Sequence, residues 1–132
     1  MRIAVDTNVL VRAAVRDDAE QTESATKLMR RAEAVAIAVT SLCEFVWVLR
    51  SVYHFRSDEM ARAIRVLLAA ENVETNRPAV EAGLAILDAG GDFADGVIAH
   101  EGQWLGGETF VSFGKRAVEM LKTQGLAARL LS

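Results

Sequence analysis

Residues 2–10 of the chain read RIAVDTNVL. Arg2–Val5 is a short, mostly apolar run, which is typical of a buried strand in a parallel sheet. Asp6 follows this run directly, and a helical pattern begins at about Asn8. Because ligands of open α/β sheets bind outside the carboxyl ends of the strands, the segment after Val5 is a candidate site.

The rest of the chain repeats this alternation of short strands and helices. Strands are expected at Arg2–Val5, Val35–Val39, Val73–Thr75, Thr109–Ser112 and Ala127–Leu131. Helices are expected at about Asn8–Val15, Asp18–Ala34, Ser41–Tyr53, Ser57–Ala70, Pro78–Ala89, Asp92–Gln103 and Lys115–Thr123. This order predicts an α/β domain with a mostly parallel sheet. We expect Asp6, Glu44 and Gly114, which follow three of the strands, to lie at one edge of that sheet.

Length and composition indicate one globular domain over residues 1–132. Hydrophobic residues make up 52% and charged residues 25%, which excludes a disordered chain. The net charge of −3 argues against indiscriminate DNA binding through a large basic surface. Cys43 is the only cysteine, so no internal disulfide is possible, and a cytoplasmic setting fits. We expect the N-terminal segment not to be a signal peptide, because Asp6 interrupts its apolar run, and no apolar run is long enough to span a membrane.

Asp6 and Glu44 each allow a structural and a functional interpretation. Asp6 has the position of a helix N-cap, but a carboxylate directly after an apolar strand is also partly desolvated and needs a partner. Ser41 and Glu44 have the spacing of a capping box. The surrounding LCEFVWVL, residues 42–49, is apolar on nearly every side, which predicts that Glu44 projects from a buried wall. That setting favours a functional role for Glu44.

The stretch AGGDFADGVIA, residues 89–99, places Asp92 and Asp95 in the first turn of a helix. Acids at this position stabilise the helix dipole, which is the structural interpretation. Their spacing of three also puts them on one face. That face continues through small residues: Gly96, Ala99 and Gly102. The other side carries residues expected in the core: Phe93, Val97 and Ile98. An acidic face without bulk predicts close approach by a charged substrate or ion.

Convergence of Asp6, Glu44 and Asp95 would bring like charges together. Unit charges about 4 Å apart repel by roughly 4 kcal/mol at an effective dielectric of about 20, so such a cluster takes up protons or binds a cation. Oxygen ligands select hard metal ions, so Mg²⁺ or Mn²⁺ is the ion expected to bind. The chemistry that follows is metal-assisted hydrolysis of a phosphodiester.

Four segments together give the chain a resemblance to a known family. DTN at 6–8, Glu44, DFADGVIA at 92–99 and ETFVSF at 108–113 occur in the order and spacing of the PIN-domain ribonucleases, and most closely of VapC-type toxins from bacterial toxin–antitoxin pairs. The resemblance runs over the whole chain. It implies a three-layer α/β/α fold with a short, mostly parallel central sheet.

The resemblance also implies an activity and partners. It implies a Mg²⁺- or Mn²⁺-dependent endoribonuclease that cleaves structured RNA such as tRNA. It further implies a homodimer and a small VapB-type antitoxin that wraps the toxin and blocks its site, with DNA contacted only through the antitoxin and no membrane partner.

Individual roles follow from the same resemblance. Asp6, Glu44 and Asp95 match the three family acids that hold the metal, and Asp92 matches an acid often found one turn earlier. The remaining matches are polar residues that hold the first acid, the scissile phosphate or the substrate: Thr7, Asn8 and Ser112.

The fourth family acid is where the chain departs from the pattern. The family places an Asp after Ser-Phe, and Gly114 stands at that position. Glycine has no side chain with which to bind a metal or position a water. The departure predicts weak or absent cleavage.

Two other functions remain open at this point. The first is a PIN-fold binding module with a failed site that still grips antitoxin or RNA. The second is a phosphatase-like hydrolase with Asp6 as nucleophile, which the Asn at position 8 and the lack of a clear Ser/Thr–Lys pair disfavour. Trp47 and Trp104 are interpreted as core or dimer contacts, and both histidines as structural. We expect the first helix to offer apolar surface to a partner through Val9, Leu10, Ala13 and Ala14.

Overall fold

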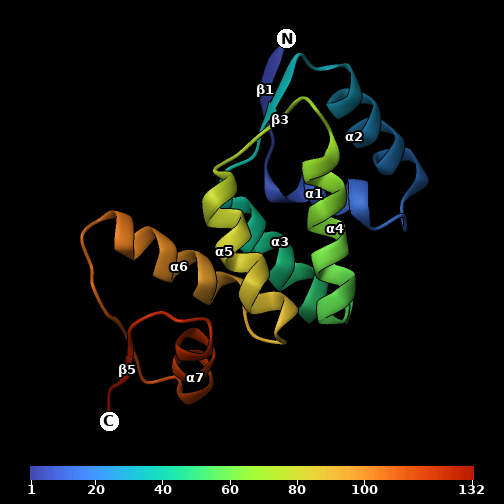
Figure 1. Cartoon of the computed structure of the whole chain (residues 1–132). Helices are drawn as coiled ribbons and strands as arrows, with labels where there is room; N and C mark the ends of the chain where they lie inside the picture. Colours follow the sequence, from blue (N-terminus) through green and yellow to red (C-terminus); the bar gives the residue numbers. More distant parts are fainter. The chain divides into compact units, whose positions relative to one another are not determined.

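The computed structural model describes all 132 residues as seven helices and five strands (Figure 1). The strands are β1 (Arg2–Ala4), β2 (Ala34–Ala36), β3 (Val73–Glu74), β4 (Phe110–Ser112) and β5 (Ala128–Leu130). The helices are α1 (Thr7–Ala14), α2 (Ala19–Arg31), α3 (Val39–Ser51), α4 (Ser57–Ala69), α5 (Arg77–Asp88), α6 (Phe93–Trp104) and α7 (Lys115–Thr123). The chain divides into two compact units, an N-terminal unit of Met1–Asn76 and a C-terminal unit of Arg77–Ser132. None of the helices has the length and apolar character needed to cross a membrane.

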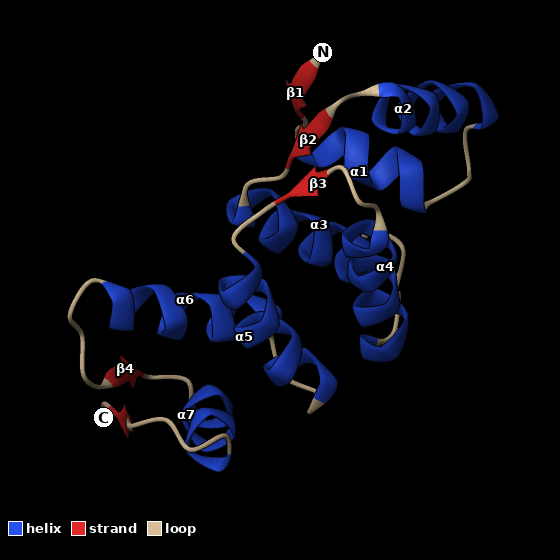
Figure 2. Cartoon of the chain, turned by 45° about the horizontal axis from the view of Figure 1, so that its top comes forward, coloured by secondary structure: helices blue, strands red, loops and turns tan.

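The N-terminal unit is built on a parallel sheet with the strand order β1-β2-β3 (Figure 2). The register places Val35 opposite Ile3 on one side and opposite Val73 on the other. Val35 and Val73 are buried, as expected of strands in a covered parallel sheet. Because β1 and β2 are parallel, the segments that lead from them to α1 and α3 leave the sheet at the same edge.

Helices α1, α3 and α4 bury their apolar stripes in a common core of the N-terminal unit. Its largest wholly buried side chains are Leu10, Leu42, Phe45, Leu49, Met60 and Ile64. Polar bonds add to this packing. Arg12 of α1 donates hydrogen bonds to Asp17 at 2.8 Å and to the Tyr53 hydroxyl at 2.9 Å. These bonds hold α1 against the end of α3, so the start of α1 and the body of α3 keep a fixed relation.

Helix α3 is followed by a residue, His54, whose backbone has the left-handed conformation. His54 has φ 58°, a conformation that favours glycine. Its N–H donates to the carbonyl of Arg50 at 3.2 Å, and the N–H of Phe55 donates to that of Leu49 at 2.9 Å. Such bonds satisfy the last carbonyls of a helix. The structural interpretation of His54 is thus a helix-ending role.

In the C-terminal unit, α5 and α6 approach closely at a pair of glycines. A Cβ at Gly83 would lie 2.6 Å from the ring of Phe93, and a Cβ at Gly96 would lie 2.8 Å from Gly83 Cα. Gly96 and Ala99 are both buried. The prediction that they form an open face for a ligand is therefore wrong: they are the helix-packing face. Ile98, which was expected in the core, is 56% exposed.

The C-terminal unit contains a second, two-stranded sheet in which β4 and β5 run parallel. Helix α7 connects these strands, and its Leu121 is buried with Ile86 and Ala99. The expectation that the strand near residues 109–112 extends the first sheet is wrong, because β4 pairs only with β5. All the strand pairs are nevertheless parallel, as the alternating pattern predicts.

Candidate active site

Asp6 lies between β1 and α1 and caps that helix. Its backbone is extended, with φ −90° and ψ 177°, and its Oδ1 accepts a hydrogen bond from the Val9 N–H at 3.1 Å. The N-cap interpretation is confirmed, because this is the bond that an N-cap carboxylate makes. The side chain is exposed rather than partly desolvated as predicted. Its second oxygen, Oδ2, takes no part in this capping hydrogen bond.

Glu44 lies in the second turn of α3, and its partner is not the one that the local spacing suggested. The helix begins at Val39 with Ala38 as N-cap and no side-chain cap, so the predicted capping box of Ser41 and Glu44 is wrong. Glu44 Oε1 accepts a hydrogen bond from Thr7 Oγ1 at 2.8 Å. Thr7 therefore holds the second acid, whereas the resemblance implied that it holds the first.

The surroundings of Glu44 also differ from the prediction. The side chain is exposed, not set in a buried wall. Helix α3 buries only one face, which consists of Val39, Leu42, Phe45, Val46 and Leu49. The carboxylate of Glu44 thus meets solvent on the opposite side of the helix, where a ligand can reach it.

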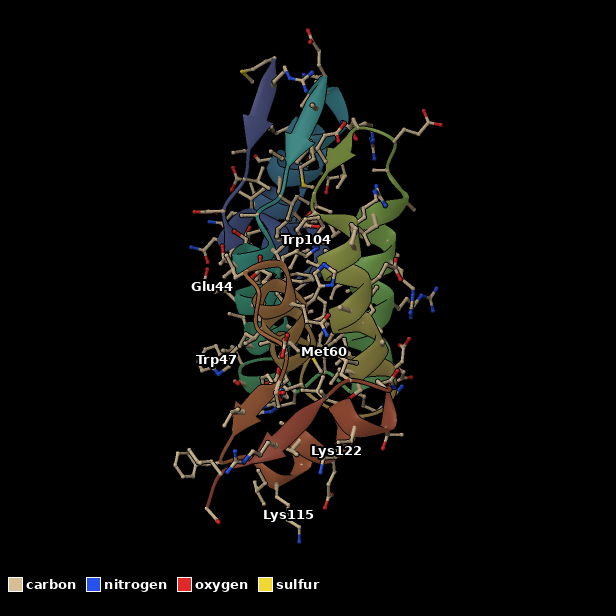
Figure 3. The ribbon with its side chains drawn as sticks, turned by 60° about the vertical axis from the view of Figure 1, so that its left-hand side comes forward. Glu44, Trp47, Met60, Trp104, Lys115 and Lys122 are labelled. Carbon is tan, nitrogen blue, oxygen red and sulfur yellow. The ribbon has the colours of Figure 1, made fainter.

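Asp6 and Glu44 share a surface pocket of about 520 Å³. Its lining is Asp6, Thr7, Asn8, Glu44, Trp47 and Val48. The polar groups are two carboxylates, a hydroxyl and an amide, and no lysine or arginine is among them. Figure 3 shows Glu44 and Trp47 on the same side of α3. The pocket offers oxygen atoms that can coordinate a metal ion, and it has no lysine or arginine to neutralise its two carboxylates. Such a pocket fits a hard divalent cation.

The C-terminal unit holds the other predicted acids at the start of α6. Asp92 was expected within the first turn, but it is the N-cap that precedes α6, and its Oδ1 accepts a hydrogen bond from the Ala94 N–H at 3.1 Å. Asp95 lies three residues on, in the first turn. Both side chains are partly exposed. The two acids therefore stand at the same helix end, as their spacing predicts.

Ser112 and Gly114 form the turn between β4 and α7. Ser112 Oγ accepts a hydrogen bond from the Gly114 N–H at 2.9 Å. Gly114 is the N-cap of α7 and supplies no side-chain cap. Its φ of −76° suits any residue, and a Cβ there would lie 3.2 Å from Ser112 Oγ and 3.6 Å from Ala117 Cβ. An aspartate thus fits at position 114 with a small adjustment of Ser112.

Four of the predicted site residues are brought together in the N-terminal unit: Asp6, Thr7, Asn8 and Glu44. The other three belong to the C-terminal unit: Asp92, Asp95 and Ser112. The structure gathers no group of three or more His, Cys, Asp or Glu side chains that could hold a metal ion. The convergence of Asp6, Glu44 and Asp95 therefore stays a prediction.

Sequence reasoning missed Trp47 as a site residue. It lines the pocket of Asp6 and Glu44 and is 58% exposed, so of its two predicted roles the place in the core is wrong, whereas a dimer contact stays a prediction. The signal that could have found it is spacing. Trp47 is three residues after Glu44 and shares its face, whereas Phe45 and Val46 point to the core.

The N-terminal unit carries another pocket, of about 580 Å³, beside α1, α2 and α4. Its lining combines apolar residues with cations: Ala13, Ala14, Arg16, Thr26, Met29, Arg30, Arg62, Ala63, Val66, Leu67, Ala70, Asn72 and Val73. Ala13 and Ala14 are thus surface residues, as expected of the first helix. Leu10 is wholly buried, so its predicted place in a contact surface is wrong.

A family model described as the PIN domain matches residues 3–120. The matched range contains every candidate site residue of both units as well as Gly114. No curated protein matches the chain. The family match confirms the predicted PIN-like α/β fold class.

Proposed function

This chain belongs to the PIN-domain family, whose fold is of nuclease type, and on that premise we propose that it is a metal-dependent endoribonuclease. We further propose that it is a VapC-type toxin whose cognate antitoxin inhibits it. The observation that carries the proposal is the pocket of Asp6 and Glu44, in which the Thr7 hydroxyl holds Glu44 at 2.8 Å. Both acids lie after neighbouring parallel strands, where α/β sheets bind ligands.

Asp6, Glu44 and Asp95 would hold Mg²⁺ or Mn²⁺ in this proposal. When bound, the ion supplies an activated water and neutralises charge on the phosphodiester in the transition state. The chain's own residues orient the ligands. The Val9 N–H fixes Asp6, the Thr7 hydroxyl fixes Glu44, and the amide of Asn8, which lines the pocket, would donate to a phosphate oxygen.

RNA cleavage with a matched pair of variants tests this function. Asp6 and Asp18 are both N-caps whose Oδ1 accepts a backbone hydrogen bond at 3.1 Å. Asp6→Asn and Asp18→Asn therefore make the same chemical change at a helix start. Only Asp6→Asn should abolish cleavage of tRNA in Mg²⁺ or Mn²⁺, and EDTA should abolish it in all proteins. Both changes can also be made in Gly114→Asp protein if the unaltered chain cleaves too slowly to measure, and equal, measurable cleavage by the two variants would contradict the proposal.

Gly114 supports a second candidate, a PIN-fold module that binds antitoxin or RNA without turnover. It stands exposed at the N-cap of α7, where the family pattern has an acid. The two candidates differ in one measurement. Metal-dependent turnover by the unaltered chain supports the nuclease, whereas RNA binding without turnover supports the module.

We propose that the antitoxin docks at the 580 Å³ pocket beside α1, α2 and α4. Its apolar floor and the guanidinium groups of Arg16, Arg30 and Arg62 suit an amphipathic segment with acidic flanks. Ala63→Glu should weaken antitoxin binding and leave RNA cleavage unchanged. A homodimer is proposed as well, and light scattering at micromolar concentration tests it, since a monomer there would contradict it.

A further inference from the structure

Trp47 is a large aromatic residue whose side chain is exposed to solvent. It is 58% exposed, although α3 buries five other apolar residues in the core. A single exposed apolar side chain is common and by itself indicates nothing. What distinguishes Trp47 is its position, because it lines the same pocket as both carboxylates of the N-terminal unit.

The geometry ties Trp47 to the acid that Thr7 holds. Glu44 and Trp47 are three residues apart on α3 and lie on the same side of it (Figure 3). The 2.8 Å bond from Thr7 fixes the Glu44 carboxylate, so the indole lies beside a group of defined position. Val48 completes an apolar border on this side of the pocket.

We propose that Trp47 stacks on an unpaired nucleobase next to the phosphate that is cleaved, and so selects RNA with a single-stranded nucleotide at that point. This inference rests on the proposed function and adds a substrate feature to it. The pocket lining has two carboxylates and no lysine or arginine, so without a bound metal ion it does not attract the RNA backbone by charge. An aromatic face can hold a base of any identity. In a duplex the base faces are already stacked, so duplex RNA cannot offer one.

Tryptophan fluorescence tests stacking without any need for cleavage. The chain has two tryptophans, so Trp104→Phe leaves Trp47 as the only indole. With EDTA present, a short unstructured single-stranded RNA should quench this emission in a saturable way. A base-free ribose-phosphate chain of the same length, or a duplex of the same sequence, should not. Absence of quenching by the single strand, or equal quenching by all three, would overturn the inference.

Cleavage kinetics give the second readout. Trp47→Ala should lower kcat/KM on single-stranded substrate by about 5- to 150-fold, the range that loss of one aromatic–base stack produces. Trp47→Phe should restore most of it. The matched control is Trp104→Ala, since Trp104 is 79% exposed and lies nine residues after Asp95, about 13 Å along α6. It should leave kcat/KM unchanged.

The two readouts separate failure of this inference from failure of the proposed function. If the unaltered chain cleaves RNA but Trp47→Ala cleaves equally well, the nuclease stands and the role of Trp47 is refuted. If no metal-dependent cleavage occurs even after Gly114→Asp, the nuclease is refuted, and quenching by single-stranded RNA in EDTA still decides whether Trp47 stacks on bases. An equal loss in Trp47→Ala and Trp104→Ala would also refute a specific role.

Discussion

The two units of the chain hold their candidate site residues in different ways. In the N-terminal unit, Asp6 and Glu44 share one pocket, and each is held by a hydrogen bond through a single oxygen. In the C-terminal unit, Asp92 caps α6 with one oxygen, and Gly114 occupies the position of an expected acid. In the proposed site, the N-terminal unit thus supplies both of its acids, whereas the C-terminal unit lacks the acid that the resemblance places at position 114. We expect loss of an acid in either unit to reduce cleavage, and an acid restored at position 114 to increase it.

The largest expected effect tests whether the two halves act as one site. Glu44→Gln and Asp95→Asn should each lower kcat/KM by at least about a hundredfold, because even partners of metal ligands are worth 10- to 100-fold. The double variant should be little worse than either single one, because groups that act as a unit are not additive. Cleavage of tRNA in Mn²⁺ measures all three.

Mn²⁺ binding provides the control for this comparison. Calorimetric titration should show weaker Mn²⁺ binding in both single variants, while thermal unfolding changes little because both side chains are at least partly exposed. If Asp95→Asn keeps full cleavage and full Mn²⁺ affinity, the C-terminal acid does not join the site. The comparison between the halves would then reduce to an active N-terminal unit alone.

Sequence patterns predicted the elements well but their partners poorly. The residues of α7, Lys115–Thr123, and the presence of two acids at the start of α6 were both anticipated. The start of α3 was not, because Ala38 gives no side-chain signal and Ser41 gives a misleading one. The bond from Thr7 to Glu44 spans 37 residues, so no local spacing contains it. Strand ends locate a site, but they do not say which hydroxyl holds which acid.

The next effect contrasts two glycines of α6 in the C-terminal unit. Gly96→Ala should lower the free energy of unfolding by about 1–3 kcal/mol, because its Cβ would enter the space of Ala82 and Gly83 on α5. At Gly102 a Cβ meets nothing within 4 Å, so Gly102→Ala should be neutral or stabilising by up to about 1 kcal/mol. Urea unfolding of the two variants measures the difference. Equal effects would mean that the small residues of α6 are not a packing face.

The contrast between Gly96 and Gly102 also explains why the small residues of α6 were wrongly predicted to form an open face for a ligand. Small residues at a spacing of three indicate close approach, but they do not identify what approaches. Here the neighbour of Gly96 is the backbone of α5, not a substrate. Only the partner helix, which lies at a distance in sequence from the acids, decides between the two interpretations.

A smaller effect is expected from restoring the missing acid. Gly114→Asp should raise the cleavage rate by about tenfold or more, since it returns an oxygen ligand or water-positioning group to the C-terminal half. Its backbone conformation is ordinary and its nearest contact is the Ser112 hydroxyl at 3.2 Å, so folding should be unaffected. Gly114→Asn has nearly the same shape without the charge and is the control. Equal cleavage by all three proteins would show that position 114 has no part in the chemistry.

In the N-terminal unit, His54→Gly should stabilise the fold by up to about 1 kcal/mol. His54 has φ 58°, which costs an ordinary residue roughly this amount and costs glycine nothing. Part of the gain is offset because glycine makes the unfolded chain more flexible. His54→Ala keeps the strain and should show no gain. Chemical denaturation compares them, and a loss of stability with glycine would indicate that the imidazole itself contributes.

The smallest expected effect concerns acid titration at the start of α4. Asp58 accepts from Arg56 Nε at 3.0 Å, and this hydrogen bond lowers the pKa of Asp58 below its ordinary value of 3.8. Because the pKa is lower in the folded chain, the pair stabilises the fold above pH 3.8, and this contribution is lost as the pH falls through the folded value. Both side chains are 72% exposed, so the effect is small. Asp58→Asn should lower Tm slightly at pH 7, and the difference should vanish well below pH 3.8. A difference that persists unchanged in acid would mean that shape, not charge, connects position 58 to stability.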